Sequence, residues 1–252
     1  MNIADYKGVW VFAEQREGEL QKVSLELLGE GRRIADELGV KLTALLLGNN
    51  IEALAKTLAE HGADEVLVAD DKNLEHYTTD AYTKVICDLA NERKPGILFV
   101  GATFIGRDLG PRIAARLSTG LTADCTSIEV EVEGGALLAT RPAFGGNLMA
   151  TIACPAHRPQ MATVRPGVFA KITTDPSNCK IEKVEQTNYD EFINLIDKDS
   201  VIEYPTVKFN SFSLSLLTPY SVCPYNAPNS KSAIVYPKEP YTVLASGSYV
   251  LF

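Results

Sequence analysis

Apolar runs and amphipathic stretches alternate through the first part of the chain. Short apolar runs predict buried strands at Gly8–Ala13, Lys41–Leu47, Glu65–Ala69 and Ile97–Gly101. Between these runs, apolar residues recur with the roughly 3.6-residue period of a helix. The segments that do so are Val23–Leu38, Ile51–Glu60 and Thr79–Glu92. Gly39 follows the first of them in the position where a glycine commonly ends a helix.

Strand and helix in alternation predict βαβ crossovers and therefore a mainly parallel sheet. The expected fold class is α/β, a doubly wound sheet with helices on both faces, of the Rossmann-like or adenine-nucleotide-hydrolase-like kind. Ligands of such sheets bind at the carboxyl ends of the strands. Here those ends fall at Glu14, Gly48, Ala69 and Gly101.

Three features near these ends suit a nucleotide, and each also has a structural explanation that we favour. Asn49-Asn50 has the chemistry to contact a ribose, but it also suits the cap of the following helix. Gly101-Ala102-Thr103 allows close approach of a ligand, and it equally suits a tight turn. Arg107-Asp108 is predicted to open a helix over Asp108–Leu117, where an aspartate favours the helix dipole. Neither GxGxxG nor GxxxxGK[ST] occurs in these loops.

The segment Thr140–Val168 has a different pattern. In order it holds Arg141-Pro142, Phe144-Gly145-Gly146-Asn147, the apolar runs Leu148–Ala153 and Met161–Val164, and Arg165-Pro166. Gly-Gly-Asn is typical of a turn. The apolar runs predict short buried strands whose ends bring the arginines to one edge. Arginine at such an edge suits anion or flavin recognition, because its charge is permanent and its donors form a fixed fork. A plain β-turn with two surface arginines is the alternative.

Composition and charge narrow the class of protein. Of 252 residues, 46% are hydrophobic and 22% are charged, as in ordinary globular proteins, and the net charge of −8 disfavours a nucleic-acid surface. No apolar run is long enough to cross a membrane, and the N-terminus lacks a secretory pattern, so we expect a cytoplasmic protein. The five cysteines are widely spaced without a CxxC pair, which favours buried free thiols in a reducing compartment over disulfides, a metal site or an iron–sulfur cluster.

Candidate catalytic groups are not arranged as a catalytic site. His61, His76 and His157 lack metal-ligand spacing, and Asp124-Cys125 is not part of a recognisable triad. A hydrolase is therefore disfavoured for want of a nucleophile with a visible base. Any catalysis would depend on a cofactor.

Three long stretches resemble one protein family. They are GATFIGRDLGPRIAARLSTGLTADCT over Gly101–Thr126, TRPAFGGNLMATI from Thr140, and RPQMATVRPG from Arg158. All three are similar to the alpha subunit of electron-transfer flavoprotein, in particular the type found with butyryl-CoA dehydrogenase in anaerobic bacteria. The similarity runs from the N-terminus to about Val184.

The resemblance implies a partner and a cofactor. Family members pair an alpha with a beta subunit, carry FAD, and exchange electrons with NADH or acyl-CoA dehydrogenases. Flavin-bifurcating members hold a second FAD in the beta subunit, close to the N-terminal domain of alpha. If this geometry is kept, Arg165 is the first candidate to lie beside that flavin. Arg141, Gly146 and Asn147 are weaker candidates for the same edge or for the subunit interface.

The last part of the chain departs from the family pattern. Residues 1–188 match the N-terminal domain, whereas the glycine-rich motifs of the FAD-binding second domain, expected beyond a linker at Lys171–Gln186, do not occur. From Lys208 onward only four charged residues remain, and prolines interrupt most runs. Residues 189–252 are interpreted as an atypical tail, either the unselected end of a fragment or frame-shifted product, which the composition favours, or a genuine short variant. We expect this tail to be poorly ordered and the shuttle FAD site to be absent.

Two other hypotheses remain beside that of a truncated alpha subunit that takes part in electron transfer. One is a non-redox module that binds an adenine nucleotide, for which Gly101–Gly106 is a poor phosphate loop. The other is a purely structural partner of the beta subunit. The structural partner differs from the electron carrier only in whether flavin stays bound at the interface.

Overall fold

The structure, a computed structural model, describes residues 2–131 and 134–184 together with the backbone of four short strands nearer the C-terminus. The chain divides into two units, Met1–Leu195 and Ile196–Phe252. The first unit holds the candidate site.

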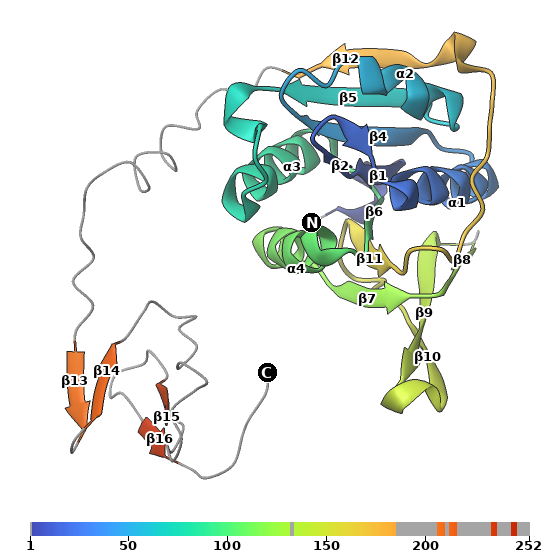
Figure 1. Cartoon of the computed structure of the whole chain (residues 1–252). Helices are drawn as coiled ribbons and strands as arrows, with labels where there is room; N and C mark the ends of the chain where they lie inside the picture. The colour runs from blue at the N-terminus through green and yellow to red at the C-terminus, as the bar shows by residue number, and fades with distance from the viewer. Residues whose placement is uncertain are drawn as a thin grey trace. The chain divides into compact units, whose positions relative to one another are not determined.

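A seven-stranded sheet forms the centre of the first unit (Figure 1). Its strands, in spatial order, are β12 (Lys180–Lys183), β5 (Glu65–Asp70), β4 (Leu42–Gly48), β1 (Val9–Ala13), β6 (Ile97–Gly101), β11 (Gln160–Val164) and β7 (Leu121–Cys125). All neighbouring pairs in it are parallel. The parallel α/β sheet predicted from the sequence is thus confirmed.

Helices cover both faces of this sheet (Figure 1). They are α1 (Lys22–Leu38), α2 (Ala53–Glu60), α3 (Thr79–Arg93) and α4 (Phe104–Arg116). Side chains of β1 alternate between two apolar clusters: Val9 and Val11 pack with α1 and α2, whereas Trp10 and Phe12 pack with α3 and α4. The alternation follows from the two-residue period of a strand, and it explains why these strands are apolar throughout.

A second, three-stranded antiparallel sheet carries a hairpin away from the main sheet (Figure 1). Its strands are β8 (Ser127–Glu131), β9 (Ala136–Ala143) and β10 (Leu148–Ile152), with the short helix η3 (Phe144–Gly146) at the tip. Ile128, Leu137 and Ala139 of this second sheet are buried in the apolar cluster that contains Val9, Val11 and the inner side of α1. Leu148 and Met149 on β10 are each 58% exposed. The prediction that the run Leu148–Ala153 forms a buried strand is therefore wrong about burial, because β10 is an edge strand outside the core.

Most predicted element boundaries agree with the structure, and two helix starts do not. Helix α2 begins at Ala53 after an N-cap at Glu52, so Asn49-Asn50 does not cap it. Instead Asn50 takes a left-handed backbone conformation (φ 55°), and its N–H donates to Asp70 Oδ1 at 2.7 Å. Helix α4 begins at Phe104, well before the predicted Asp108.

The segment predicted as a linker contributes a strand. Lys180–Lys183, inside Lys171–Gln186, pairs in parallel with β5 as the edge strand β12. Its side chains are mostly exposed, so backbone hydrogen bonds and ion pairs such as Glu182 with Arg93 hold it in place. A strand whose side chains face solvent lacks the apolar pattern that reveals strands in a sequence.

Four strands are described in the second unit, and they form two antiparallel hairpins. They are β13 (Thr206–Phe209) with β14 (Phe212–Ser215), and β15 (Ala233–Val235) with β16 (Val243–Ala245). The prediction that residues 189–252 are poorly ordered falls mainly outside the described residues and stays a prediction.

Candidate functional site

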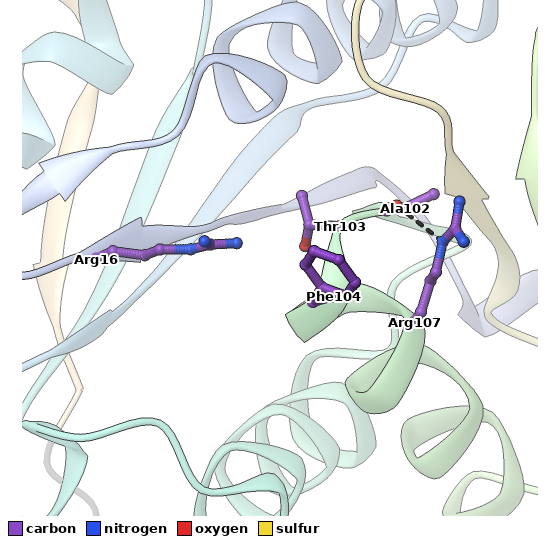
Figure 2. Close-up of a pocket in the computed structure, with 5 residues that line it drawn as sticks. All are labelled: Arg16, Ala102, Thr103, Phe104 and Arg107. Carbon is purple, nitrogen blue, oxygen red and sulfur yellow. Dashed lines mark hydrogen bonds between the residues drawn. The ribbon is translucent and has the colours of Figure 1, made fainter.

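The order of strands creates a switch point between β1 and β6. From β1 the chain winds outward through β4 and β5, then returns to β6 on the other side of β1. In doubly wound sheets the crevice at such a point, at the carboxyl ends of the strands, is where ligands bind. A pocket of about 410 Å³ lies there, lined by Arg16, Ala102, Thr103, Phe104 and Arg107 (Figure 2).

The wall of this pocket is built by the turn from β6 into α4. Thr103 is the N-cap of α4, and its hydroxyl accepts a hydrogen bond from the Gly106 N–H at 3.0 Å. Residue 106 has to be glycine, because a Cβ there would lie 1.7 Å from the carbonyl oxygen of Gly101. The tight turn that we favoured at Gly101-Ala102-Thr103 is thus confirmed. The prediction that Asp108 lies at the N-terminus of the helix is wrong, because α4 begins at Phe104 and Thr103 is its N-cap.

Two arginines line the pocket, and a buried carboxylate behind the wall holds one of them. Glu14, 1% exposed, accepts two hydrogen bonds from Arg16, at 2.7 and 3.1 Å, and a third from the hydroxyl of Thr103. The Phe104 ring is 90% exposed, and Arg107 Nε donates to the Ala102 carbonyl oxygen at 3.0 Å (Figure 2). A buried carboxylate therefore fixes one guanidinium at the rim, and a backbone carbonyl fixes the other.

Arg165 lies at the carboxyl end of β11, where the sequence predicted it. Its Nη2 and Nε donate to the two carboxylate oxygens of Asp124, at 2.6 and 3.2 Å. Arg107 approaches the same carboxylate, with its Nη2 3.5 Å from Oδ1. The arginine of the pocket and the arginine of β11 thus share one aspartate.

The Asp124 carboxylate is influenced by more than one arginine. The Arg165 hydrogen bonds and charge, with Arg107 and Arg141 adding to them, hold the pKa of this carboxyl below its ordinary value. Three guanidinium groups thus act on a single carboxylate. This edge therefore keeps a net positive charge with exposed donors, which suits an anionic ligand.

The other predicted residues are divided between this edge and the hairpin tip. Arg141 lies within β9, opposite Ala150 of β10, and not at a strand end as predicted. Its charge nevertheless acts on Asp124, so it belongs to the edge. Gly146 and Asn147 are exposed at the tip of the hairpin. They belong with the exposed apolar residues of β10.

The described part of the chain gives little support for a metal site, a membrane-spanning helix or a reactive cysteine. There, no group of His, Cys, Asp and Glu residues could hold a metal ion, and no helix is long and apolar enough to cross a membrane. Cys87 and Cys125 are buried and free, as predicted, whereas Cys154 and Cys179 are free but only half-buried; Cys223 lies outside the described residues. Burial raises the pKa of the Cys87 and Cys125 thiols to about 11, which disfavours either as a nucleophile.

Two residues of this edge do not follow from the sequence. The sequence predicts only that Glu14 lies at a strand end, and Asp124 has no place in a recognisable triad. Glu14 directly follows the apolar strand β1, whereas Asp124 lies within β7, whose sequence LTADC has no strong apolar pattern. Only the topology brings Asp124 beside Arg165, which is 41 residues away in the chain.

The chain matches the model of one protein family. The model of the electron transfer flavoprotein domain matches residues 9–189, which include every strand of the seven-stranded sheet. The chain belongs to the electron transfer flavoprotein family.

Its relatives include proteins named as electron transfer flavoprotein subunit alpha, and others with different names. The chain is 88% identical over 185 residues to "Protein FixB" of Clostridium saccharobutylicum, with 73% of this chain and 55% of the relative covered. It is 70% identical over 186 residues to the electron transfer flavoprotein subunit alpha of Clostridium acetobutylicum, covering 74% and 55%. It is 50% identical over 192 residues to the acryloyl-CoA reductase electron transfer subunit beta of Anaerotignum propionicum, covering 68% and 52%. The chain thus spans about half the length of the curated relatives it matches.

Proposed function

We propose that this chain works as an alpha-type subunit of an electron transfer flavoprotein, pairs with a beta subunit and lines a FAD held at their interface. The observation that carries the proposal is the arginine edge, where Arg165 donates two hydrogen bonds to Asp124 and Arg107 approaches the same carboxylate. FAD, when bound, supplies the electron-carrying chemistry. The chain supplies charge and position.

The residues present fit such a group. A flavin ring gains negative charge on reduction, and a preorganised cation beside it stabilises that charge. Arg165 is 45% exposed, so its guanidinium is available at the surface while Asp124 fixes its direction. Because an arginine stays charged at all ordinary pH values, the stabilisation requires no proton uptake by the protein.

The hairpin supports the pairing part of the proposal. Leu148, Met149 and Ile152 expose apolar surface on β10, beside Gly146 and Asn147 at the tip. Neighbouring exposed apolar side chains on a projecting strand are typical of an interaction surface. We assign the β9–β10 hairpin to the beta subunit, and Arg165 with Arg141 to the flavin.

The donors and acceptors follow from the family and from one relative's name. NADH or an acyl-CoA dehydrogenase supplies the electrons, and flavin-based bifurcation is included in the proposal. The relative named as an acryloyl-CoA reductase electron transfer subunit supports an acyl-CoA-linked partner.

Flavin content tests the proposal directly. The full chain is co-expressed with an electron transfer flavoprotein beta subunit, and the amount of FAD per purified complex is measured. The flavin absorbance is then recorded before and after adding NADH. We expect about one FAD per heterodimer, bleached by NADH. Co-purification without flavin would leave only a structural partner, and failure to co-purify would contradict the pairing itself.

Replacing Arg165 tests the arginine edge within that complex. We expect Arg165→Ala to weaken flavin retention about tenfold, the effect of losing one charged hydrogen-bonding group. Arg112→Ala is the matched control, because Arg112 is also 45% exposed and pairs with one carboxylate, Asp80, at 2.6 Å. Equal flavin content and equal NADH-driven reduction in both variants would contradict the role of Arg165.

A second candidate function is binding of an adenine nucleotide without redox chemistry. The pocket at the switch point favours it, because Arg16 and Arg107 offer donors beside the exposed Phe104 ring. Titration calorimetry of the chain alone with AMP distinguishes the two candidates. Binding of AMP that is lost in Arg107→Ala, together with heterodimers free of flavin, would favour this second candidate.

A further inference from the structure

A bulge in the sheet determines where Asp124 points. In the pairing of β7 with β11, Thr122 lies opposite Ala162 and Cys125 lies opposite Val164. Ala123 and Asp124 therefore occupy the space opposite one residue, Thr163. Such an extra residue breaks the ladder locally and redirects a side chain, and bulges are frequent beside functional sites.

The backbone at the bulge is strained. Asp124 has φ 60°, in the left-handed region that residues with a side chain seldom enter. Its N–H donates to the hydroxyl of Thr163 at 2.9 Å, and Thr163 is 1% exposed. The buried threonine thereby replaces the ladder hydrogen bond and holds the strained residue in place.

The strained residue is aimed at Arg165. The Arg165 N–H donates to the Cys125 carbonyl oxygen at 3.0 Å, next to the bulge, so both ends of the ion pair are fixed to the same short segment. The two side-chain hydrogen bonds between Arg165 and Asp124 then leave the guanidinium little freedom to rotate. A surface ion pair by itself adds little stability, so it does not explain why the strained backbone at Asp124 is retained. Strained residues of this kind are concentrated at functional sites.

We propose that Asp124 is a positioning residue, which the bulge between β7 and β11 aims at Arg165 so that the guanidinium faces the bound flavin in one orientation. This inference rests on the proposed function for the flavin, and on the geometry of the bulge for the positioning. Asp124 acts through Arg165 and does not itself contact the ligand.

The first test uses the full chain without its partner. We expect the Arg165 Nε–H to give a resolved, slowly exchanging resonance in a ¹H–¹⁵N spectrum, because it is held by Asp124. Asp124→Gly should remove that resonance while the fold is kept, since glycine adopts φ 60° without strain. Asp124→Asn should restore it in part, and Asp80→Asn, which removes the partner of Arg112, should leave it unchanged. A resonance that survives in Asp124→Gly would overturn the proposal.

The second test uses the flavin-bearing heterodimer. If Asp124 positions Arg165, Asp124→Gly lowers the flavin reduction potential when Arg165 is present and has no effect in an Arg165→Ala background. If Asp124 acts only through its own charge, its removal raises the potential equally in both backgrounds, and the proposal is wrong. A heterodimer without flavin would contradict the proposed function alone, and the resonance in the free chain would still decide the role of Asp124.

Discussion

Two carboxylates at the carboxyl edge of the sheet each hold an arginine at the surface. Glu14 is almost fully buried and binds Arg16, whereas Asp124 is about a quarter exposed and binds Arg165. A guanidinium held by a carboxylate keeps unused donors in a fixed direction, so it is ready for an anion without further ordering. At the residue scale, the site therefore consists of arginines whose freedom has already been removed.

The ion pair of Asp124 predicts how stability depends on acid. Its folded-state pKa lies below the ordinary value of 3.8, mainly because of the Arg165 hydrogen bonds, with Arg107 and Arg141 adding to the effect. The stability it contributes is therefore present at neutral pH and is lost as the pH falls below about 4 through the folded pKa. In urea titrations, the stability difference between the native chain and Asp124→Asn should be present at pH 7 and should disappear toward pH 2. A difference that stays constant over this range would show that the charge of Asp124 adds nothing.

At the scale of elements, the junction between β6 and α4 places the pocket. The first turn of α4 packs so closely on the end of β6 that only a glycine fits at position 106. Further along the same helix, Gly110 lies near the side chain of Thr163, the residue that supports Asp124. Helix α4 is thus packed against both the pocket and the bulge, and its position fixes both.

Two glycine substitutions on α4 should differ sharply in effect. In Gly106→Ala the new Cβ would lie 1.7 Å from the Gly101 carbonyl oxygen, so the backbone has to move. We expect a loss of about 3 kcal/mol in the free energy of unfolding, typical of overpacking at a site that cannot relax. In Gly110→Ala the nearest atom is the Thr163 methyl group at 3.0 Å, and the gain of about 1 kcal/mol in helix propensity offsets the crowding. Equal unfolding midpoints for the two variants would contradict this packing.

At the scale of the whole molecule, the first unit consists of a sheet packed between helices and a projecting arm, the β9–β10 hairpin. The parallel sheet between its two helical layers holds the arginine edge, and the β9–β10 hairpin extends from it with exposed apolar side chains (Figure 1). A chemical edge and an apolar arm on one unit suit a protein whose cofactor lies at an interface.

Charged substitutions on the arm test its role in assembly. We expect the double variant Leu148→Asp with Met149→Asp to change the free energy of unfolding of the free chain by less than about 0.5 kcal/mol, because both side chains are exposed. The same variant should lose co-purification with the beta subunit. Ile181→Asp is the control, since Ile181 is 52% exposed on β12, the edge strand at the other side of the sheet. Retention of the beta subunit by the double variant would remove the arm from the interface.

The sequence by itself determined the fold class and the main elements. Apolar runs such as Gly8–Ala13 and periodic stretches such as Val23–Leu38 are local patterns, because a strand buried on both faces has to be apolar and an amphipathic helix has to repeat its apolar positions. The same local information failed where burial does not follow from the pattern. Leu148–Ala153 is apolar but exposed on β10, and Lys180–Lys183 is charged but forms β12.

Only the tertiary structure decided how the site is composed. The sequence singled out Arg165, Arg141, Gly146 and Asn147, and the fold brings the two arginines to one edge while it leaves the glycine and asparagine at the hairpin tip. The role of Asp124 depends on a bulge relative to β11, and a register between strands far apart in the chain has no local signature. Local sequence fixes which residues form strands and helices, whereas the pairing of distant strands fixes which charges meet.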